Sequence, residues 1–135
     1  MIKRLFPLLL SLFAAGFLFY ACDDSITAND IENKIIPDSN VSYAEYIQPL
    51  FTIKCATSGC HDDRTQSAGL TLTSYGFAVS NYSMIAPGNP SNSKVVWAIE
   101  GNGARLMPPY GVTRPMTANQ IAGVKTWIRE GAKNN

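Results

Sequence analysis

The most informative segment of this 135-residue chain is Cys55-Ala56-Thr57-Ser58-Gly59-Cys60-His61. Two cysteines close together, with a histidine directly after the second, form the arrangement that attaches a haem: the thiols make thioethers and the imidazole binds one face of the iron. The usual attachment motif has two residues between its cysteines, and here there are four. His61 is the only histidine of the chain, and it lies where an axial ligand is required. The segment therefore predicts a covalent haem on Cys55, Cys60 and His61.

A haem that shuttles electrons without binding gases needs a second axial ligand, and a methionine thioether is the usual one. Three methionines follow the attachment segment, Met84, Met107 and Met116. Met107 precedes Pro108 and Pro109, whose fixed φ and missing backbone donors let a loop hold a side chain in place. Met84 precedes a turn without such support, and Met116 adjoins a helix start. We therefore predict Met107 as the second ligand.

Four motifs of the chain follow one another in the order known from one protein family. They are Ile47-Gln48-Pro49-Leu50-Phe51, Pro87-Gly88-Asn89-Pro90-Ser91-Asn92-Ser93, Met107-Pro108-Pro109 and Trp127-Ile128-Arg129-Glu130-Gly131-Ala132. On these motifs the stretch 43–132 resembles a small bacterial c-type cytochrome domain of the monohaem, class I-like kind. The resemblance implies an all-α, cytochrome c-like domain wrapped around one covalent haem c, with His61 and Met107 on the iron.

The chain begins with the pattern of a signal peptide. Lys3 and Arg4 give a positive start, and residues 5–19 are almost entirely apolar. This run is too short for a confident membrane span, because about 18–20 apolar residues are wanted for spanning. We assign residues 1–21 to a signal peptide, and the alternative is an uncleaved anchor helix.

Phe19-Tyr20-Ala21-Cys22 resembles the lipobox of bacterial lipoproteins, although the aromatic pair departs from it. The resemblance implies cleavage before Cys22 and lipidation of that residue, and several acyl chains make a stable anchor. Lipidation also accounts for the odd one of the three cysteines. The expected location is the cell envelope, with the protein lipid-anchored to a membrane and facing the periplasm or the cell exterior.

The next segment, 22–41, is rich in Asp, Asn, Ser and Thr and has few large apolar residues. Such a composition buries too little apolar surface to offset the entropy lost on ordering. We therefore predict a flexible tether over 22–41 and a cytochrome c-like domain over 42–135. Alternatively, Ile31, Ile35 and Ile36 could form one helical turn that packs on the domain.

Capping signals predict where the first helix begins. Ser42 and Glu45 have the pattern of a capping box, which opens a helix that runs towards Cys55. Pro49 lies too far inside this helix to be harmless, so the helix should kink or restart near it. A short helix is also expected over 74–79.

Two further helices are predicted in the second half of the domain. One starts at residues 90–91 and runs through Ile99 until glycines stop it. The other opens with a second capping box, Thr117 to Gln120, and continues with apolar residues at helical spacing. Trp127 lies beside these residues and is expected to pack against the first helix, or simply to fill the core.

Charge and motif content limit the possible functions. From residue 42 onward there are eight Lys/Arg and five Asp/Glu, a bias too mild to indicate a nucleic-acid partner. The sequence has no phosphate-binding glycine loop and no Ser-His-Asp set. With both axial positions of the iron filled, no site is open for substrate chemistry, so we expect a carrier and not an enzyme.

The sequence therefore predicts a membrane-anchored monohaem c-type cytochrome that carries single electrons between redox partner proteins. The alternative is a haem-free exported lipoprotein, a binding module in which Cys55 and Cys60 form a disulfide that closes a short loop. A metal site on Cys55, Cys60 and His61 is a third interpretation, but only three ligands are local. Neither a disulfide nor such a metal site requires the ordered motifs that follow.

Overall fold

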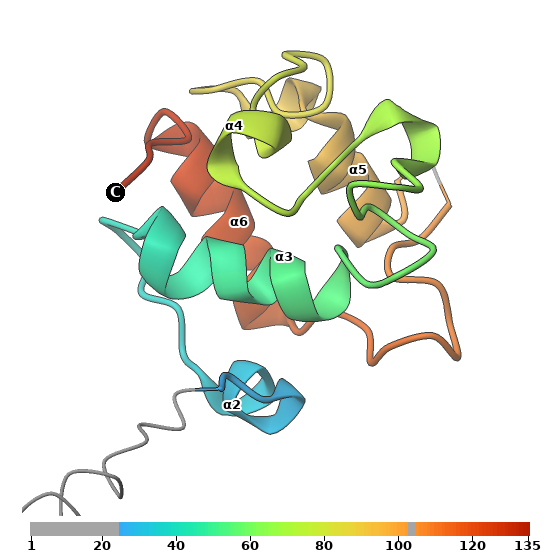
Figure 1. Cartoon of the computed structure of the whole chain (residues 1–135). Coiled ribbons are helices and arrows are strands. Elements are labelled where there is room, and N and C mark those ends of the chain that lie inside the picture. The colour runs from blue at the N-terminus through green and yellow to red at the C-terminus, as the bar shows by residue number, and fades with distance from the viewer. Residues whose placement is uncertain (1–24, 103–104) are drawn as a thin grey trace, which may run out of the picture.

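The computed structural model describes residues 25–102 and 105–135. Within these ranges the structure is helical and contains no strand, which confirms the predicted all-α class (Figure 1). The helices are α2 (Ala28–Asn33), a π-helical turn (Tyr43–Ile47), α3 (Gln48–Lys54), α4 (Tyr75–Ala78), α5 (Lys94–Glu100) and α6 (Ala118–Arg129), with 3-10 turns at Ser67–Gly69 and Pro90–Asn92. The short helix expected over 74–79 is present as α4. The helix expected to start at residues 90–91 is divided: a 3-10 turn ends at Asn92, Ser93 is extended, and α5 starts at Lys94.

The predicted signal peptide, 1–21, and the predicted lipidation site, Cys22, lie outside the described residues. Among the helices that are described, none is long and apolar enough to cross a membrane.

The first helix of the domain changes its hydrogen-bond pattern at the proline, as the sequence predicts. Ser42 caps its start by accepting a bond from the Glu45 backbone N–H (3.2 Å). The chain forms a π-helical turn and then restarts as α3, in whose first turn Pro49 needs no backbone partner. Pro49 has no N–H to offer the Glu45 carbonyl one turn earlier, and Lys34 Nζ donates to that oxygen instead (2.9 Å). The Glu45 carboxylate lies 3.7 Å from Lys34 Nζ rather than completing a capping box.

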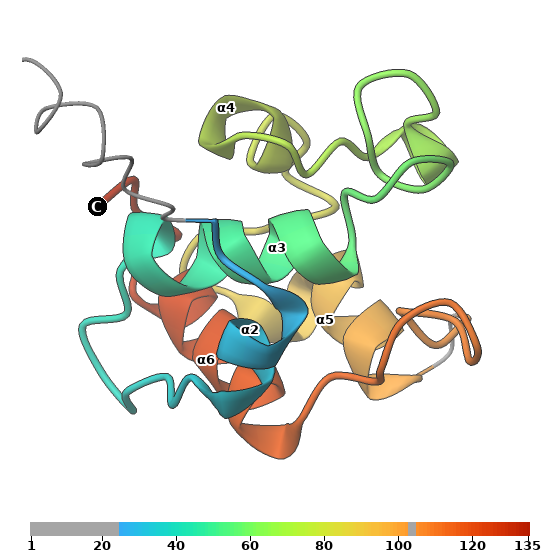
Figure 2. The ribbon, with the colours of Figure 1, turned by 60° about the horizontal axis from the view of Figure 1, so that its bottom comes forward.

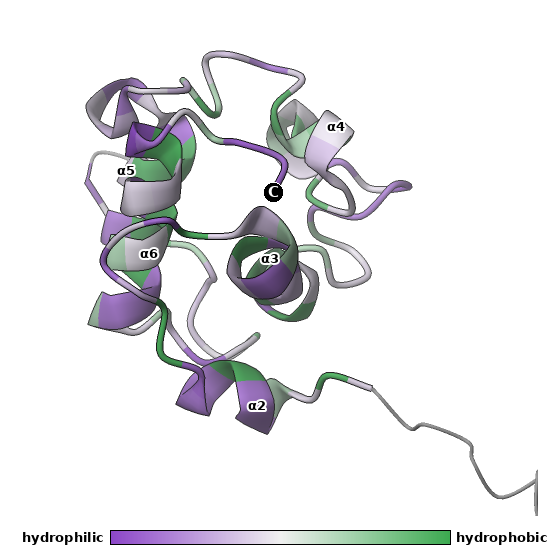
Figure 3. Cartoon of the chain, turned by 90° about the vertical axis from the view of Figure 1, so that its left-hand side faces the viewer, coloured by the Kyte–Doolittle hydropathy of each residue, from purple (hydrophilic) through white to green (hydrophobic). Residues whose placement is uncertain are grey.

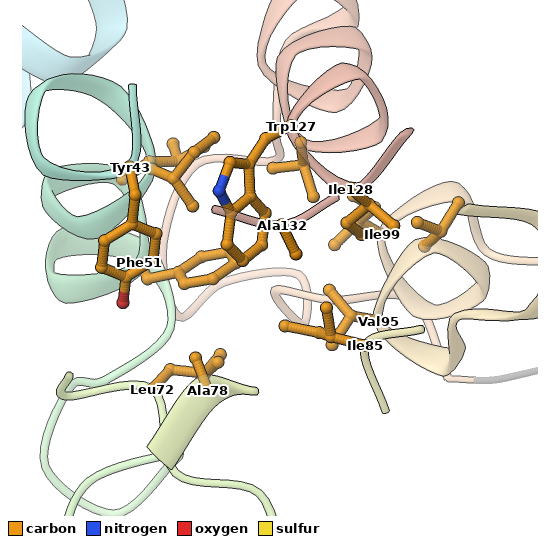
Figure 4. Close-up of a cluster of buried hydrophobic side chains, with 14 of the residues drawn as sticks. Tyr43, Phe51, Leu72, Ala78, Ile85, Val95, Ile99, Trp127, Ile128 and Ala132 are labelled. Carbon is orange, nitrogen blue, oxygen red and sulfur yellow. The ribbon is translucent and has the colours of Figure 1, made fainter. Parts of the chain in front are cut away.

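The core is built around the indole of Trp127 on α6 (Figure 4). Its ring centroid lies 5.3 Å from that of Tyr43 and 6.2 Å from that of Phe51, and the Phe51 ring meets it edge-on at 83°. The predicted packing of Trp127 against the first helix is thus confirmed. The capping box at Thr117 and Gln120 is also present and sets the start of α6. These contacts fix α6 against the first helix, and α5 packs beside α6.

Residues 25–41 differ from the expected flexible tether. Thr27 caps α2, and Ile31 and Ile36 are buried against the domain, while Ile35 points to solvent. Figure 3 shows the apolar side of α2 facing the body of the molecule and its hydrophilic side facing away. The Ile36 side chain lies so close to Gly123 that a Cβ there would come within 2.6 Å of it. The alternative of a helical turn packed on the domain describes this segment better, although only Ile31 lies in the helix, and Ile35 and Ile36 follow it.

Polar contacts also hold this segment, which lies against α3 and α6 in Figure 2. Asn119 exchanges two hydrogen bonds with the backbone of Ile36, at 2.8 and 2.9 Å. Gln120 Nε2 donates to the Ile31 carbonyl (3.0 Å), and the Glu130 carboxylate accepts from two further backbone N–H groups of the segment. Low apolar content is compensated here because α6 supplies partners for the segment's backbone.

Candidate haem-attachment site

The loop after α3 folds Cys55, Cys60 and His61 into one compact unit. Cys55 caps the C-terminal end of α3, and its carbonyl accepts from the His61 backbone N–H at 3.1 Å. Between them, the N–H of Cys60 donates to the Thr57 carbonyl (3.0 Å), which closes a turn. Gly59 sits in this turn with φ +86°, a left-handed conformation that favours glycine. The turn thus accommodates the two residues beyond the usual spacing, and it brings the His61 backbone back into contact with Cys55.

Both cysteines of the loop are free thiols. The disulfide of the alternative interpretation is therefore not formed in this structure. Burial raises the pKa of the Cys55 thiol to about 12; the nearby Lys54 charge opposes this shift and Cys60 adds to it. Two free thiols and an imidazole held in one loop are the donor set that covalent haem attachment requires, so the residues present fit the group.

The imidazole of His61 is held in one orientation. Its Nδ1 lies 3.1 Å from the carbonyl oxygen of Leu70. A carbonyl can only accept, so Nδ1 carries the proton of this bond, and the lone pair of Nε2 is left for a metal. The backbone carbonyl of His61 accepts from the Leu72 N–H (2.9 Å). Because Leu70 and Leu72 are buried in the core, the ring is fixed to the domain.

Asp62 organises the same loop and was not singled out from the sequence. Its carboxylate accepts from the backbone N–H groups of Gly59 (2.8 Å), Arg64 (3.0 Å) and Thr65 (2.5 Å). These hydrogen bonds hold the pKa of the Asp62 carboxyl below its usual range. An aspartate followed by polar residues at such positions is typical of an Asx turn, a signal that could have identified it.

Met107 lies on a second loop, after α5. Its backbone N–H donates to the Ala98 carbonyl at 2.9 Å, which ties the residue to the end of that helix. Its side chain is partly exposed. Met116, by contrast, is only 9% exposed and belongs to the core, and Met84 packs against the core from outside. All three methionines lie outside the helices, and Met107 differs from the other two in that it is neither buried in the core nor packed against it.

The structure unites Cys55, Cys60 and His61 but leaves Met107 on a separate segment. In Figures 1 and 2 the attachment loop and the loop after α5 lie at the same end of the molecule, beyond the ends of α3 and α5. Within the described residues no hydrogen bond joins the two loops directly. The assignment of Met107 as an iron ligand stays a prediction.

A separate groove of about 490 Å³ does not belong to this site. It is lined by Ser91, Val96, Trp97, Glu100, Asn102 and Lys125. Its charged groups already pair with each other, since Lys125 Nζ lies 2.5 Å from Glu100 Oε1. Across 25–102 and 105–135, no three His, Cys, Asp or Glu side chains gather as a metal-binding cluster, so the third interpretation of the cysteines gains no support.

The sequence model of one protein family, planctomycete cytochrome C, matches residues 58–111 of this chain. The matched part is less than half of the chain and includes Cys60, His61 and Met107. Neither the curated proteins nor the solved structures that were searched gave a match. The family match supports a cytochrome c-like domain, and with it the binding of haem c.

Proposed function

We propose that this protein is a membrane-anchored monohaem c-type cytochrome that carries single electrons between redox partner proteins. One observation carries the proposal: His61, directly after the second free cysteine, has Nδ1 held by the Leu70 carbonyl, so that Nε2 is available for iron. The match to a cytochrome family over 58–111 supports it independently.

Each residue of the site has one role under this proposal. Cys55 and Cys60 would hold the haem through thioethers, and His61 and Met107 would supply the ligands of its iron. Haem iron supplies one-electron redox chemistry, and a thioether ligand raises the reduction potential. With His61 and Met107 both bound to the iron, no position would be open for a substrate, so we expect a carrier and not an enzyme.

The proposed location rests on the signal-peptide and lipobox-like pattern of residues 1–22. Cleavage before Cys22 and acylation of that cysteine would anchor the protein to a membrane of the cell envelope, facing the periplasm or the exterior. Mass spectrometry of the membrane fraction should show a chain that begins at Cys22 with added acyl mass. The partners are redox proteins, and no nucleic acid is involved.

The central test is covalent attachment. The full chain is expressed in cells with a working haem maturation system, denatured, and stained in a gel for haem peroxidase activity. A coloured band is expected for the wild type and for Cys22→Ser, which removes the only cysteine outside the attachment loop. Cys60→Ser should give a weaker band, because only the thioether at Cys55 can then hold the haem.

A wild-type band without colour would overturn the proposal. The haem-free alternative would then be examined by measuring the mass of the non-reduced chain, since a Cys55–Cys60 disulfide lowers it by two hydrogens.

A further inference from the structure

Lys54 is a lysine whose charge lies inside the protein. Its side chain is only 2% exposed. The ammonium donates to Glu32 Oε1 (2.6 Å), to the Arg114 carbonyl (3.2 Å) and to the Pro115 carbonyl (3.1 Å). An ammonium has three protons to donate, so every proton has an acceptor here.

These three bonds join three segments that are far apart in the sequence. Glu32 lies on α2, and Lys54 is the last residue of α3, directly before Cys55. Arg114 and Pro115 end the loop that carries Met107. The earlier part of that loop is bound where the Met107 N–H meets the end of α5. The ammonium of Lys54 thus fastens the second end of the loop to the helix that leads to the attachment site.

The acid partner decides whether this arrangement is stable. A lysine is almost never fully buried unless it is paired, and removing one partner of a buried pair leaves an uncompensated charge that is strongly destabilising. Two neutral carbonyls do not compensate a positive charge. Without Glu32, the ammonium would therefore be driven towards water and away from Arg114 and Pro115.

We propose that Glu32 and Lys54 are positioning residues for Met107, so that the segment before the domain helps to hold the second axial ligand. The inference rests on the proposed function, since it takes Met107 as an iron ligand. It assigns a role to residues 25–41 beyond that of a linker: they supply the counter-charge that keeps the Met107 loop closed.

The test uses the full chain with haem attached and compares Glu32→Gln with Glu45→Gln. Glu45 forms the other ion pair of the same segment, with Lys34 at 3.7 Å, but this pair is exposed and does not contact Lys54. For each variant we would measure how fast added imidazole displaces the methionine, followed as loss of the sulfur–iron charge-transfer band of the oxidised haem. Unfolding midpoints are recorded alongside.

Glu32→Gln should raise the displacement rate about tenfold, the factor that corresponds to about 1.4 kcal/mol in loop opening. Glu45→Gln should change it by less than about twofold, because exposed ion pairs contribute little. Lys54→Met, which removes the ammonium itself, should reproduce the effect of Glu32→Gln. The inference would be overturned if Glu32→Gln lowered the unfolding midpoint but showed the same displacement rate as Glu45→Gln. Glu32 would then have only a structural role.

A second readout separates this inference from the proposed function. In the haem-free full chain, hydrogen exchange should be faster in Glu32→Gln than in Glu45→Gln at the Met107 and Val112 amides, which donate to the Ala98 (2.9 Å) and Pro109 (3.3 Å) carbonyls. If the wild-type protein binds haem but shows no sulfur–iron band, Met107 is not the ligand and the proposed function fails at that point. The inference that Glu32 and Lys54 position Met107 then fails as well. Equal hydrogen exchange in the two variants would instead show that Glu32 and Lys54 do not hold the loop.

Discussion

The two loops of the candidate site are held in different ways. The attachment loop binds itself: the Cys55 carbonyl, the Asp62 carboxylate and the Leu70 carbonyl all accept from groups within the same twenty residues. The loop with Met107 is instead bound by other elements, through Ala98 on α5 and Lys54 on α3. The half of the site with three predicted haem contacts is therefore encoded locally, whereas the half with one contact depends on the whole fold.

Burial follows the same division. Leu70 and Leu72 carry the end of the attachment loop into the core. The other loop is buried only in part: Pro108 is buried next to Met107, but Tyr110 is 79% exposed and Val112 also faces solvent. Loops with few buried apolar contacts open at low free energy. We therefore expect changes in the core to disturb both loops, and local changes to disturb one of them.

The largest effect is expected from Trp127→Ala, which removes the ring shared by the first helix and α6. Truncating a fully buried tryptophan costs about 3–5 kcal/mol through lost burial and the cavity left behind. Both loops should become less stable together, because the core that supports each of them is disrupted. The two loops would then no longer differ in how easily they open. Denaturant unfolding measures the loss.

The chain offers a matched control in its other tryptophan. Trp97 is 39% exposed and donates its N–H to the Ser91 carbonyl (2.7 Å). Trp97→Ala should cost about 1 kcal/mol, the contribution of a typical hydrogen bond. Equal losses in the two variants would show that the core is not organised around Trp127.

Met107→Ala should act on one loop only. It should abolish the sulfur–iron band of the oxidised protein, open the iron to added ligands and lower the reduction potential, because the thioether favours ferrous iron. Covalent haem should remain, since the attachment loop is untouched. Absorbance spectra and a redox titration measure these changes.

The other two methionines serve as controls. Met84→Ala and Met116→Ala should keep the band, although the second should lose about 2–5 kcal/mol of stability because Met116 is buried. If the band survives Met107→Ala, the variant that does remove it identifies the ligand.

Much of the local structure could be predicted from the sequence because its causes are local. The Ser42 and Thr117 caps, the restart at Pro49 and the contact of Trp127 with the first helix each depend on a helix-start signal, a missing N–H or a helical period, and all were found. The attachment segment was recognised for the same reason: its three functional residues are close in sequence. Whether they bind haem stays a prediction.

The parts that could not be predicted depend on distant partners. Residues 25–41 look too polar to fold alone, and they are ordered because Asn119 and Gln120 of α6 bind their backbone. Lys54 would ordinarily face solvent, and it is buried because Glu32 lies opposite it. Neither pairing leaves a trace in composition or periodicity, since the partners are separated by many residues.

A smaller effect, confined to the attachment loop, is expected from Asp62→Ala. The change removes the acceptor of three backbone N–H groups, so hydrogen exchange should rise a few-fold at Gly59, Arg64 and Thr65. Exchange in the Met107 loop should not change. Asp63→Ala is the control, because Asp63 accepts through its carboxylate only from the Thr73 hydroxyl in the described bonds. Equal exchange in the two variants would contradict the role given to Asp62.

The smallest effect concerns alkaline pH and Tyr43, whose hydroxyl donates to Gln48 Oε1. Gln48 Nε2 in turn donates to the Leu72 carbonyl (3.3 Å), so this chain of bonds reaches the attachment loop and not the loop of Met107.

Burial, and to a lesser degree the neighbouring Tyr75, raise the pKa of Tyr43 to about 12 from its ordinary value near 10. The folded protein therefore keeps the phenol proton over a range in which the unfolded chain releases it. The stability that this difference contributes is present below about pH 10 and is lost as the pH rises towards about 12. Tyr43→Phe should flatten the fall of the unfolding free energy in that window, whereas Tyr110→Phe, at an exposed site, should retain the wild-type fall. Denaturant titrations of the haem-loaded protein at several pH values measure both slopes, and identical slopes for the two variants would show that Tyr43 does not couple alkaline pH to folding.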